Sequence, residues 1–201
     1  MPTILGRDVG PIGYGLMSHT LGAPASLPTE DETFEALRTA ADLGCLLWNG
    51  GEMYGPPTNN SLVLLNRFFS KHPEYADKVV LNIKGSMKPN WVPDCTPENI
   101  RQSVNNCVKQ LNGTCRIHMF ECARRDTNVP LDQQLNALKE LVEDGTIDSV
   151  ALSEVNANTI REAAQIVNIS AVEIELSLWN TGPFENGIVK ACADLDIPIL
   201  A

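Results

Sequence analysis

Short apolar segments alternate along the chain with longer amphipathic segments. The short segments are rich in large aliphatic residues and span only a few positions, which is typical of buried strands. The longer segments carry apolar residues at helical spacing. We expect seven strands, with a helix before each strand after the first. The expected strands cover residues 12–17, 46–49, 78–83, 116–122, 147–152, 171–176 and 197–201, and the expected helices cover residues 29–44, 60–69, 96–111, 131–143, 158–167 and 184–195.

Two of these helices have clear start signals. Thr29, with Glu32 three residues later, forms a capping-box pattern, in which each side chain accepts a hydrogen bond from the other residue's backbone N–H. Pro97 follows Thr96 in the first-turn position that suits a residue without a backbone N–H. These signals place the two helix starts independently of the apolar pattern.

The regular alternation of strand and helix predicts an α/β fold with right-handed βαβ units and a parallel sheet. Linkers are short and no low-complexity segment interrupts the pattern, so we expect one domain over residues 1–201. A (β/α)8 barrel and a doubly wound sheet both fit the alternation. The doubly wound sheet is disfavoured because Gly10, Gly13 and Gly15 lack the GxGxxG spacing that such sheets use to bind a dinucleotide.

Composition narrows the class of protein. The formal charge is −10, from 15 Lys and Arg against 25 Asp and Glu, and so acidic a chain lacks the basic surface that binds nucleic acid. No apolar run reaches the roughly 18 residues of a membrane helix, and the N-terminus lacks the pattern of a signal peptide. We therefore expect a cytoplasmic protein without a membrane partner. The six cysteines are scattered without a CxxC pair, which favours reduced, buried thiols over a metal site.

Polar residues gather where the expected strands end, and in a barrel the catalytic groups lie at the C-terminal ends of the strands. Tyr54 follows the second strand, and Lys84 ends the third. A buried lysine is costly unless it is paired. Beside a phenol, an ammonium lowers the phenol's pKa and makes it a better general acid toward a carbonyl that gains hydride. The alternative is a loop tyrosine and a lysine whose ammonium reaches water.

Five segments together resemble the aldo-keto reductase family, and their variants are most similar to its fungal pyridoxal reductase branch. The segments are WNGGEMYG at 48–55, FECARRD at 120–126, EDGTIDSVALSEVN at 143–156, VEIELSLW at 172–179 and CADLDIPILA at 192–201. The resemblance spans essentially the whole chain. It implies a (β/α)8 TIM barrel and an NADPH-dependent aldehyde reductase. The small aldehyde substrate that it suggests is pyridoxal, reduced to pyridoxine.

The resemblance also implies catalytic roles for particular residues. Tyr54 matches the family's proton donor, and Lys84 matches the lysine that assists it. Asn49 stands where most members carry an aspartate that pairs with the lysine, so its amide would bind Lys84 without contributing charge. Ala123 stands where most members carry a histidine, and an alanine cannot polarise a carbonyl. His118 is no substitute, because odd spacing from residue 123 places it on the other face of the strand.

Cofactor contacts follow from the resemblance in the same way. Ser153 and Glu154 match the family's Ser-Asn pair that holds the nicotinamide carboxamide, and Glu173 matches a glutamine with the same task. Neither glutamate can donate a hydrogen bond to the carboxamide oxygen. Glu173 has an alternative role as a buried ion-pair partner of Lys84 or Arg124. No metal site is expected.

The chain covers about six β/α units and the start of a seventh strand, so we expect an incomplete barrel. Aldo-keto reductases bind the cofactor's phosphates with loops after strands seven and eight. An open barrel would also leave unpaired strand edges, through which copies of the chain could associate. The alternative to an active reductase is therefore a degenerate, catalytically inactive half-barrel that acts as a binding or regulatory protein.

Overall fold

A computed structural model describes residues 2–201, which form two compact units. The first unit comprises Met1–Lys84 and Ser103–His118, and the second comprises Gly85–Gln102 and Met119–Ala201. One helix, α4 (Pro97–Leu111), begins in the second unit and ends in the first. The single domain expected over residues 1–201 stays a prediction.

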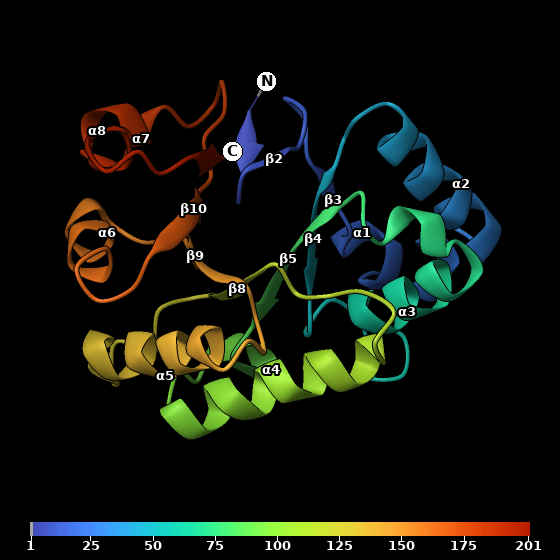
Figure 1. The fold of residues 1–201 in the computed structure, drawn as a ribbon, viewed down its shortest axis with the longest axis horizontal. Helices are drawn as coiled ribbons and strands as arrows, with labels where there is room; N and C mark the ends of the chain where they lie inside the picture. Colours follow the sequence, from blue (N-terminus) through green and yellow to red (C-terminus); the bar gives the residue numbers. More distant parts are fainter. Residues whose placement is uncertain (1) are drawn as a thin grey trace. The chain divides into compact units, whose positions relative to one another are not determined.

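Three parallel strands form the sheet of the first unit. They are β3 (Tyr14–Gly15), β4 (Leu47–Gly51) and β5 (Val80–Gly85), with β4 between the other two. Helices α2 (Glu30–Asp42) and α3 (Ser61–Lys71) lie on one side of these strands (Figure 1). The short elements of this unit are α1 (Met17–Thr20) and the 3-10 helices η1 (Pro24–Ser26) and η2 (Pro73–Tyr75).

The core of the first unit is an aromatic cluster between β4 and α3. Trp48 and Phe68 are completely buried, with ring centroids 5.6 Å apart, and Phe69 stacks on Trp48 at 5.9 Å. The indole N–H of Trp48 donates to the carbonyl of Cys45 at 2.8 Å, so its one polar group is satisfied. Successive side chains on a strand point to opposite faces of the sheet. Because Trp48 points toward the helices, Asn49 points to the opposite face.

A β-hairpin at the N-terminus was not predicted. Strands β1 (Thr3–Ile4) and β2 (Arg7–Asp8) pair antiparallel across a two-residue turn, in which Leu5 and Gly6 both have positive φ. Ile4 is buried. Arg7 donates to the carbonyl of Val79 at 3.2 Å, which ties the hairpin to the start of β5.

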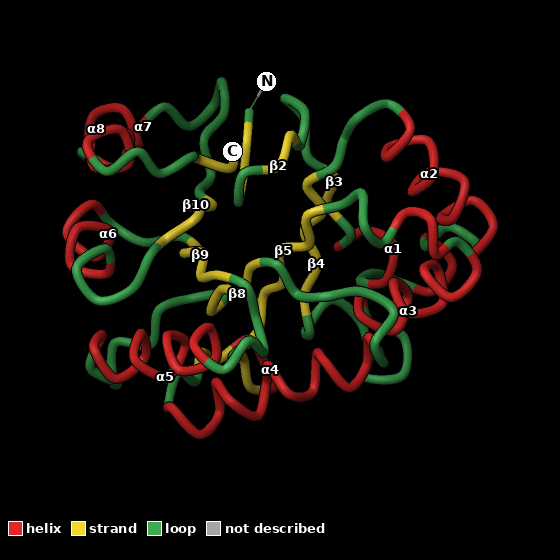
Figure 2. The backbone as a smooth tube through the Cα atoms, in the orientation of Figure 1, coloured by secondary structure: helices red, strands yellow, loops and turns green. Residues whose placement is uncertain are grey.

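The second unit repeats the parallel arrangement with four strands. They are β8 (Met119–Cys122), β9 (Ser149–Ser153), β10 (Ile169–Glu173) and β11 (Ile199–Leu200), each paired with the next along the chain. Figure 2 shows the helices of this unit outside its strands. They are α5 (Leu131–Glu143), α6 (Ala157–Ala163), α7 (Gly182–Glu185) and α8 (Ile188–Asp194).

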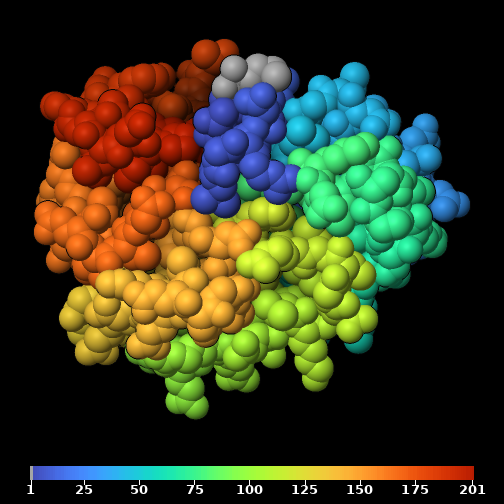
Figure 3. Space-filling view, in the orientation of Figure 1, coloured from blue at the N-terminus to red at the C-terminus, as the bar shows by residue number. Residues whose placement is uncertain are grey.

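Helices that pack against one another cover the outer side of the second unit. Helix α6 contacts both α5 and α8, and the side chains of these segments form a continuous packed surface (Figure 3). A small hairpin of β6 (Met87–Lys88) and β7 (Val92–Pro93), joined by the 3-10 helix η3 (Pro89–Trp91), precedes α4. No helix within residues 2–201 combines the length and the apolar character needed to cross a bilayer.

The predicted alternation of strands and helices is confirmed, and two predicted elements are wrong. The helix expected at 184–195 is two helices, because Gly187 has a φ of +87°, which no right-handed helix contains. The strand expected at 12–17 is reduced to β3. Leu16 already has a helical φ and ψ, and α1 begins at Met17. The strand pairing therefore ends where the backbone N–H of Leu16 donates to the backbone carbonyl of Asn49.

Candidate active site

Lys84 and Asn49 are in contact in the first unit, as predicted. Lys84 lies near the end of β5 with only 5% of its surface exposed, and its Nζ donates to Asn49 Oδ1 at 3.2 Å. The register explains the contact. Asn49 on β4 pairs with Asn82, which lies two residues before Lys84 and therefore on the same face of β5. The amide oxygen of Asn49 satisfies one donor of a buried ammonium without adding a negative charge.

Tyr54 lies at the same edge of this sheet. Its ring packs on Gly51, where a Cβ atom would lie 3.0 Å from the ring's Cγ and Cδ2. Gly51 is in turn the parallel-ladder partner of Lys84, and paired strands lie about 4.8 Å apart. The structure therefore brings the predicted proton donor, the lysine and the asparagine together on the strand ends β4 and β5.

The turn that carries Tyr54 is held rigidly from two helices. Its carbonyl accepts from Thr20 Oγ1 at 2.6 Å and from the backbone N–H of Ser61 at 3.2 Å. Gly55 follows with a φ of +110°, and a Cβ there would lie 2.6 Å from the carbonyl oxygens of Thr20 and Asn59. Fixing a side chain through its backbone in this way limits its motion. Sequence reasoning did not identify these supporting residues.

In the second unit, Ser153 and Glu173 lie side by side. They are paired across β9 and β10. Ser153 is 2% exposed, and its hydroxyl has no hydrogen-bond partner within residues 2–201. A buried hydroxyl without a partner costs free energy on the order of 1–3 kcal/mol. The Ser153 hydroxyl is therefore available to a ligand.

Glu154 has a role that the sequence did not indicate. Its φ of +52° lies in the left-handed region, which is uncommon for a residue other than glycine. Its backbone N–H donates to the carbonyl of Glu173 at 2.9 Å. Its carboxylate Oε1 accepts from the backbone N–H of Glu175 at 2.8 Å, so the side chain holds the loop after β10. A carboxylate has further acceptor positions that a ligand can use.

Ala123 and His118 both lie as the sequence analysis expected. Ala123 directly follows β8, is buried, and has only a methyl group to present. His118 is structural: its Nδ1 accepts from the backbone N–H of Leu81 at 3.1 Å, and its Nε2 lies 2.9 Å from Arg7 Nη1. Neither residue can polarise a carbonyl.

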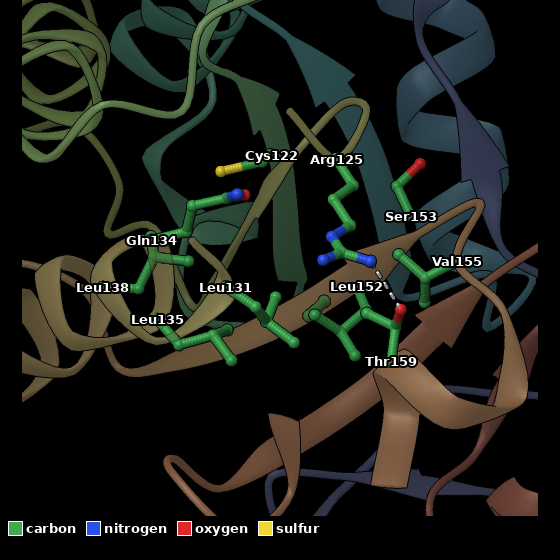
Figure 4. A pocket seen from close by; sticks show the side chains of 11 residues that line it. Cys122, Arg125, Leu131, Gln134, Leu135, Leu138, Leu152, Ser153, Val155 and Thr159 are labelled. Carbon is green, nitrogen blue, oxygen red and sulfur yellow. Dashed lines mark hydrogen bonds between the residues drawn. The ribbon is translucent and has the colours of Figure 1, made fainter. Parts of the chain in front are cut away.

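A cavity lies between α5, β9 and the start of α6 in the second unit (Figure 4). Its walls include Leu131, Leu135 and Val155, and Arg125 Nη1 donates across it to Thr159 Oγ1 at 3.2 Å. Figure 4 shows the Ser153 side chain directed away from the leucines. Ser153 is also one of the residues that line the cavity.

Known proteins resemble this chain along its whole length. The model of the Aldo/keto reductase family matches residues 11–201. The chain is 43% identical over 204 residues to a Schizosaccharomyces pombe protein named probable pyridoxal reductase 2, covering 100% of this chain and 60% of that protein. It is 32% identical over 212 residues to the same organism's "Aldo-keto reductase yakc [NADP(+)]", covering 98% of this chain and 58% of that protein. The chain thus spans about three fifths of the length of these relatives.

A solved structure shows the same fold. The glycerol dehydrogenase from Gluconobacter oxydans superimposes with a TM-score of 0.83 at 19% identity, covering 99% of this chain and 62% of that one. Identity this low supports the fold alone. The α/β fold of parallel β/α units is thereby confirmed as part of the barrel that these enzymes share.

Proposed function

Because the chain belongs to the aldo/keto reductase family, we propose that it serves in the NADPH-dependent reduction of an aldehyde, with Tyr54 as proton donor. The observation that carries the proposal is the cluster at the ends of β4 and β5. There the ring of Tyr54 packs on Gly51, the ladder partner of Lys84, and Lys84 binds Asn49. A phenol and an ammonium at one strand edge suit protonation of a carbonyl oxygen.

NADPH, when bound, supplies the hydride for such a reduction. Tyr54 would donate its hydroxyl proton to the aldehyde oxygen as negative charge develops there. The Lys84 ammonium favours the tyrosinate that remains. General-acid catalysis of this kind contributes about 10²–10⁴-fold in rate. Asn49 binds Lys84 without adding a negative charge.

The Ser153 hydroxyl suits the cofactor's carboxamide. It is buried and can both donate and accept a hydrogen bond, and within residues 2–201 it does neither. Glu154 and Glu173 would accept from the carboxamide NH₂. The relatives' names support the remaining details of the proposal: "NADP(+)" for the cofactor and pyridoxal for the substrate. A cytoplasmic location and self-association through barrel edges stay predictions.

A second candidate is a protein that binds the cofactor or a partner without catalysing reduction. The observation that favours it is Ala123, whose methyl group cannot polarise a carbonyl. Asn49 is consistent with it, because no carboxylate at this position pairs with Lys84. The two candidates differ in turnover, and a protein that binds only a partner would also fail to bind the cofactor.

One experiment separates them. The chain is titrated with NADPH while nicotinamide fluorescence is followed, and NADPH oxidation is then measured with pyridoxal present. Binding with turnover supports the reductase, and binding without turnover supports the second candidate. No binding at millimolar NADPH would refute the reductase and leave only a protein that binds a partner. Ser153→Ala should weaken binding by about five- to tenfold, which corresponds to a lost hydrogen bond of about 1 kcal/mol, whereas the exposed Ser70→Ala should not.

A further inference from the structure

Glu52, the residue directly after β4, has its backbone and its side chain bound within the first unit. Its backbone N–H donates to the carbonyl of Lys84 at 2.8 Å, and its carbonyl accepts from Asn60 Nδ2 at 2.9 Å. Its carboxylate Oε1 accepts from Asn106 Nδ2 at 3.2 Å, and Oε2 accepts from the Ser103 hydroxyl. Each of its polar groups therefore has a partner.

The partners of Glu52 belong to three different elements. Lys84 lies on β5, and Asn60 is the N-cap of α3. The two residues that bind the carboxylate lie on the part of α4 that belongs to the first unit. Asn60 also donates to Gln110 Oε1 of α4 at 2.8 Å, which links the two helices directly. Glu52 thus lies where one strand and two helices meet, although these elements are distant in the sequence.

Glu52 also lies inside the turn that carries Tyr54. The backbone N–H of Tyr54 closes this turn by donating to the carbonyl of Gly51 at 3.1 Å. Between these two residues, the N–H of Glu52 holds the turn against the backbone of Lys84. The backbones of Tyr54 and Lys84 are therefore joined through Glu52, and the Glu52 carboxylate ties this junction to α4.

We propose that Glu52 is a positioning residue, which sets Tyr54 against Lys84 by fixing the turn between them to α4. The inference rests on the proposed function, in which Tyr54 donates the proton and Lys84 assists it. The effect of an ammonium on a phenol depends on the distance between them. A misplacement of about 1 Å can cost about 10²-fold in rate.

Two substitutions of Glu52 separate its position from its charge. A glutamine can keep both side-chain hydrogen bonds, because its oxygen accepts from Asn106 and its NH₂ donates to the Ser103 hydroxyl. An alanine removes both bonds. Glu52→Ala should therefore release the turn, whereas Glu52→Gln should keep the turn in place without the negative charge.

The test follows the ring of Tyr54 by fluorine NMR. The chain contains three tyrosines, so a chain made with fluorotyrosine gives three signals, and the signal that Tyr54→Phe removes is that of Tyr54. In Glu52→Ala we expect this signal to shift and the titration midpoint of the Tyr54 phenol to rise, because the Lys84 ammonium no longer lies at a fixed place beside it. The signals of the other two tyrosines should stay unchanged.

Two neighbouring asparagines of α4 provide a milder variant and its matched control. Asn106→Ala removes one of the two carboxylate bonds at an exposed position, so it should fold and shift the Tyr54 signal in the same direction as Glu52→Ala. Asn105 is also exposed, and within residues 2–201 no hydrogen bond joins it to Glu52, so Asn105→Ala should leave the signal unchanged. If Glu52→Ala does not fold, the two asparagine variants still decide.

Three results would overturn the proposal. They are an unchanged Tyr54 signal in Glu52→Ala, equal effects of Asn105→Ala and Asn106→Ala, and a shift in Glu52→Gln as large as that in Glu52→Ala, since the charge would then be responsible. None of these measurements needs turnover, so a chain that does not reduce pyridoxal would refute the reductase while the fluorine signals still decide the role of Glu52. In a chain that does, the kcat of Glu52→Ala should fall by up to about 10²-fold with the Kd for NADPH unchanged.

Discussion

Gly55→Ala is a sharp test of how the turn carrying Tyr54 is held. Gly55 has a φ of +110°, which side-chain-bearing residues rarely adopt. The added Cβ would lie 2.6 Å from two carbonyl oxygens, those of Thr20 and Asn59. Neither oxygen can retreat as a flexible side chain would, because both belong to the backbone. The substitution therefore combines backbone strain with a steric clash.

The expected magnitude follows from those two contributions. A left-handed backbone costs an L residue about 1–2 kcal/mol, and overpacking a well-packed site adds about 1–3 kcal/mol. The free energy of unfolding should fall by about 2–5 kcal/mol, a large share of the about 5–15 kcal/mol that a native protein has. Two glycines of the same unit provide controls. Gly44 has a φ of +86° with no atom within 4 Å of an added Cβ, and Gly15 has open space without a positive φ.

The assay is urea unfolding followed by tryptophan fluorescence. Trp48 reports on the first unit because it is completely buried, whereas Trp91 and Trp179 are 55% and 92% exposed. Gly15→Ala should change stability by less than about 1 kcal/mol, and Gly44→Ala should cost about 1–2 kcal/mol. Gly55→Ala should cost clearly more than either. Equal losses for Gly44→Ala and Gly55→Ala would refute the close approach at the Tyr54 turn.

Three further predictions concern the first unit. Thr20→Val removes the hydroxyl that donates to the Tyr54 carbonyl and should cost about 1 kcal/mol in urea unfolding; no loss would mean that this bond does not hold the turn. Phe68→Ala should cost about 3–5 kcal/mol because the ring is completely buried, and a loss under 1 kcal/mol would contradict the packing. Burial lowers the pKa of His19 below its usual 6.5, so the stability that this residue contributes is complete above pH 6.5 and is lost as the pH falls through the folded-state pKa. His19→Leu should flatten this acid-side decline, because protonated His19 cannot accept from Tyr14, and an unchanged profile would contradict the assignment.

Long, strongly patterned elements were predictable from the sequence. The helix expected at 131–143 is α5 with the same bounds, and the capping box of Thr29 and Glu32 is formed at the start of α2. The N-terminal hairpin was missed because its two-residue strands are too short to show alternation. In its turn, Leu5 has a positive φ, which the sequence does not predict because leucine rarely adopts it. The split at Gly187 was missed because glycine is also tolerated within helices.

The sequence predicted which side chains form the candidate site, but it did not predict the residues that hold them in place. The position of Lys84 at the end of a strand and the family resemblance identified Lys84 and Asn49, and their contact is present. Thr20 and Gly55 were not identified, because their importance comes from contacts between segments distant in the sequence. Likewise, nothing local indicates that the Glu154 carboxylate binds the backbone of the following strand's loop. Such tertiary contacts have no periodic signal along the chain.

The most direct test of the reductase proposal is the rate of NADPH oxidation by Tyr54→Phe with pyridoxal as substrate. Phenylalanine keeps the ring that packs on Gly51 and removes only the hydroxyl, so folding and cofactor binding should be retained. Turnover should fall by about 10²–10⁴-fold, the usual contribution of a general acid, while the Kd for NADPH stays the same. A Tyr54→Phe variant that turns over at the rate of the unaltered chain would contradict the assignment of Tyr54 as the proton donor.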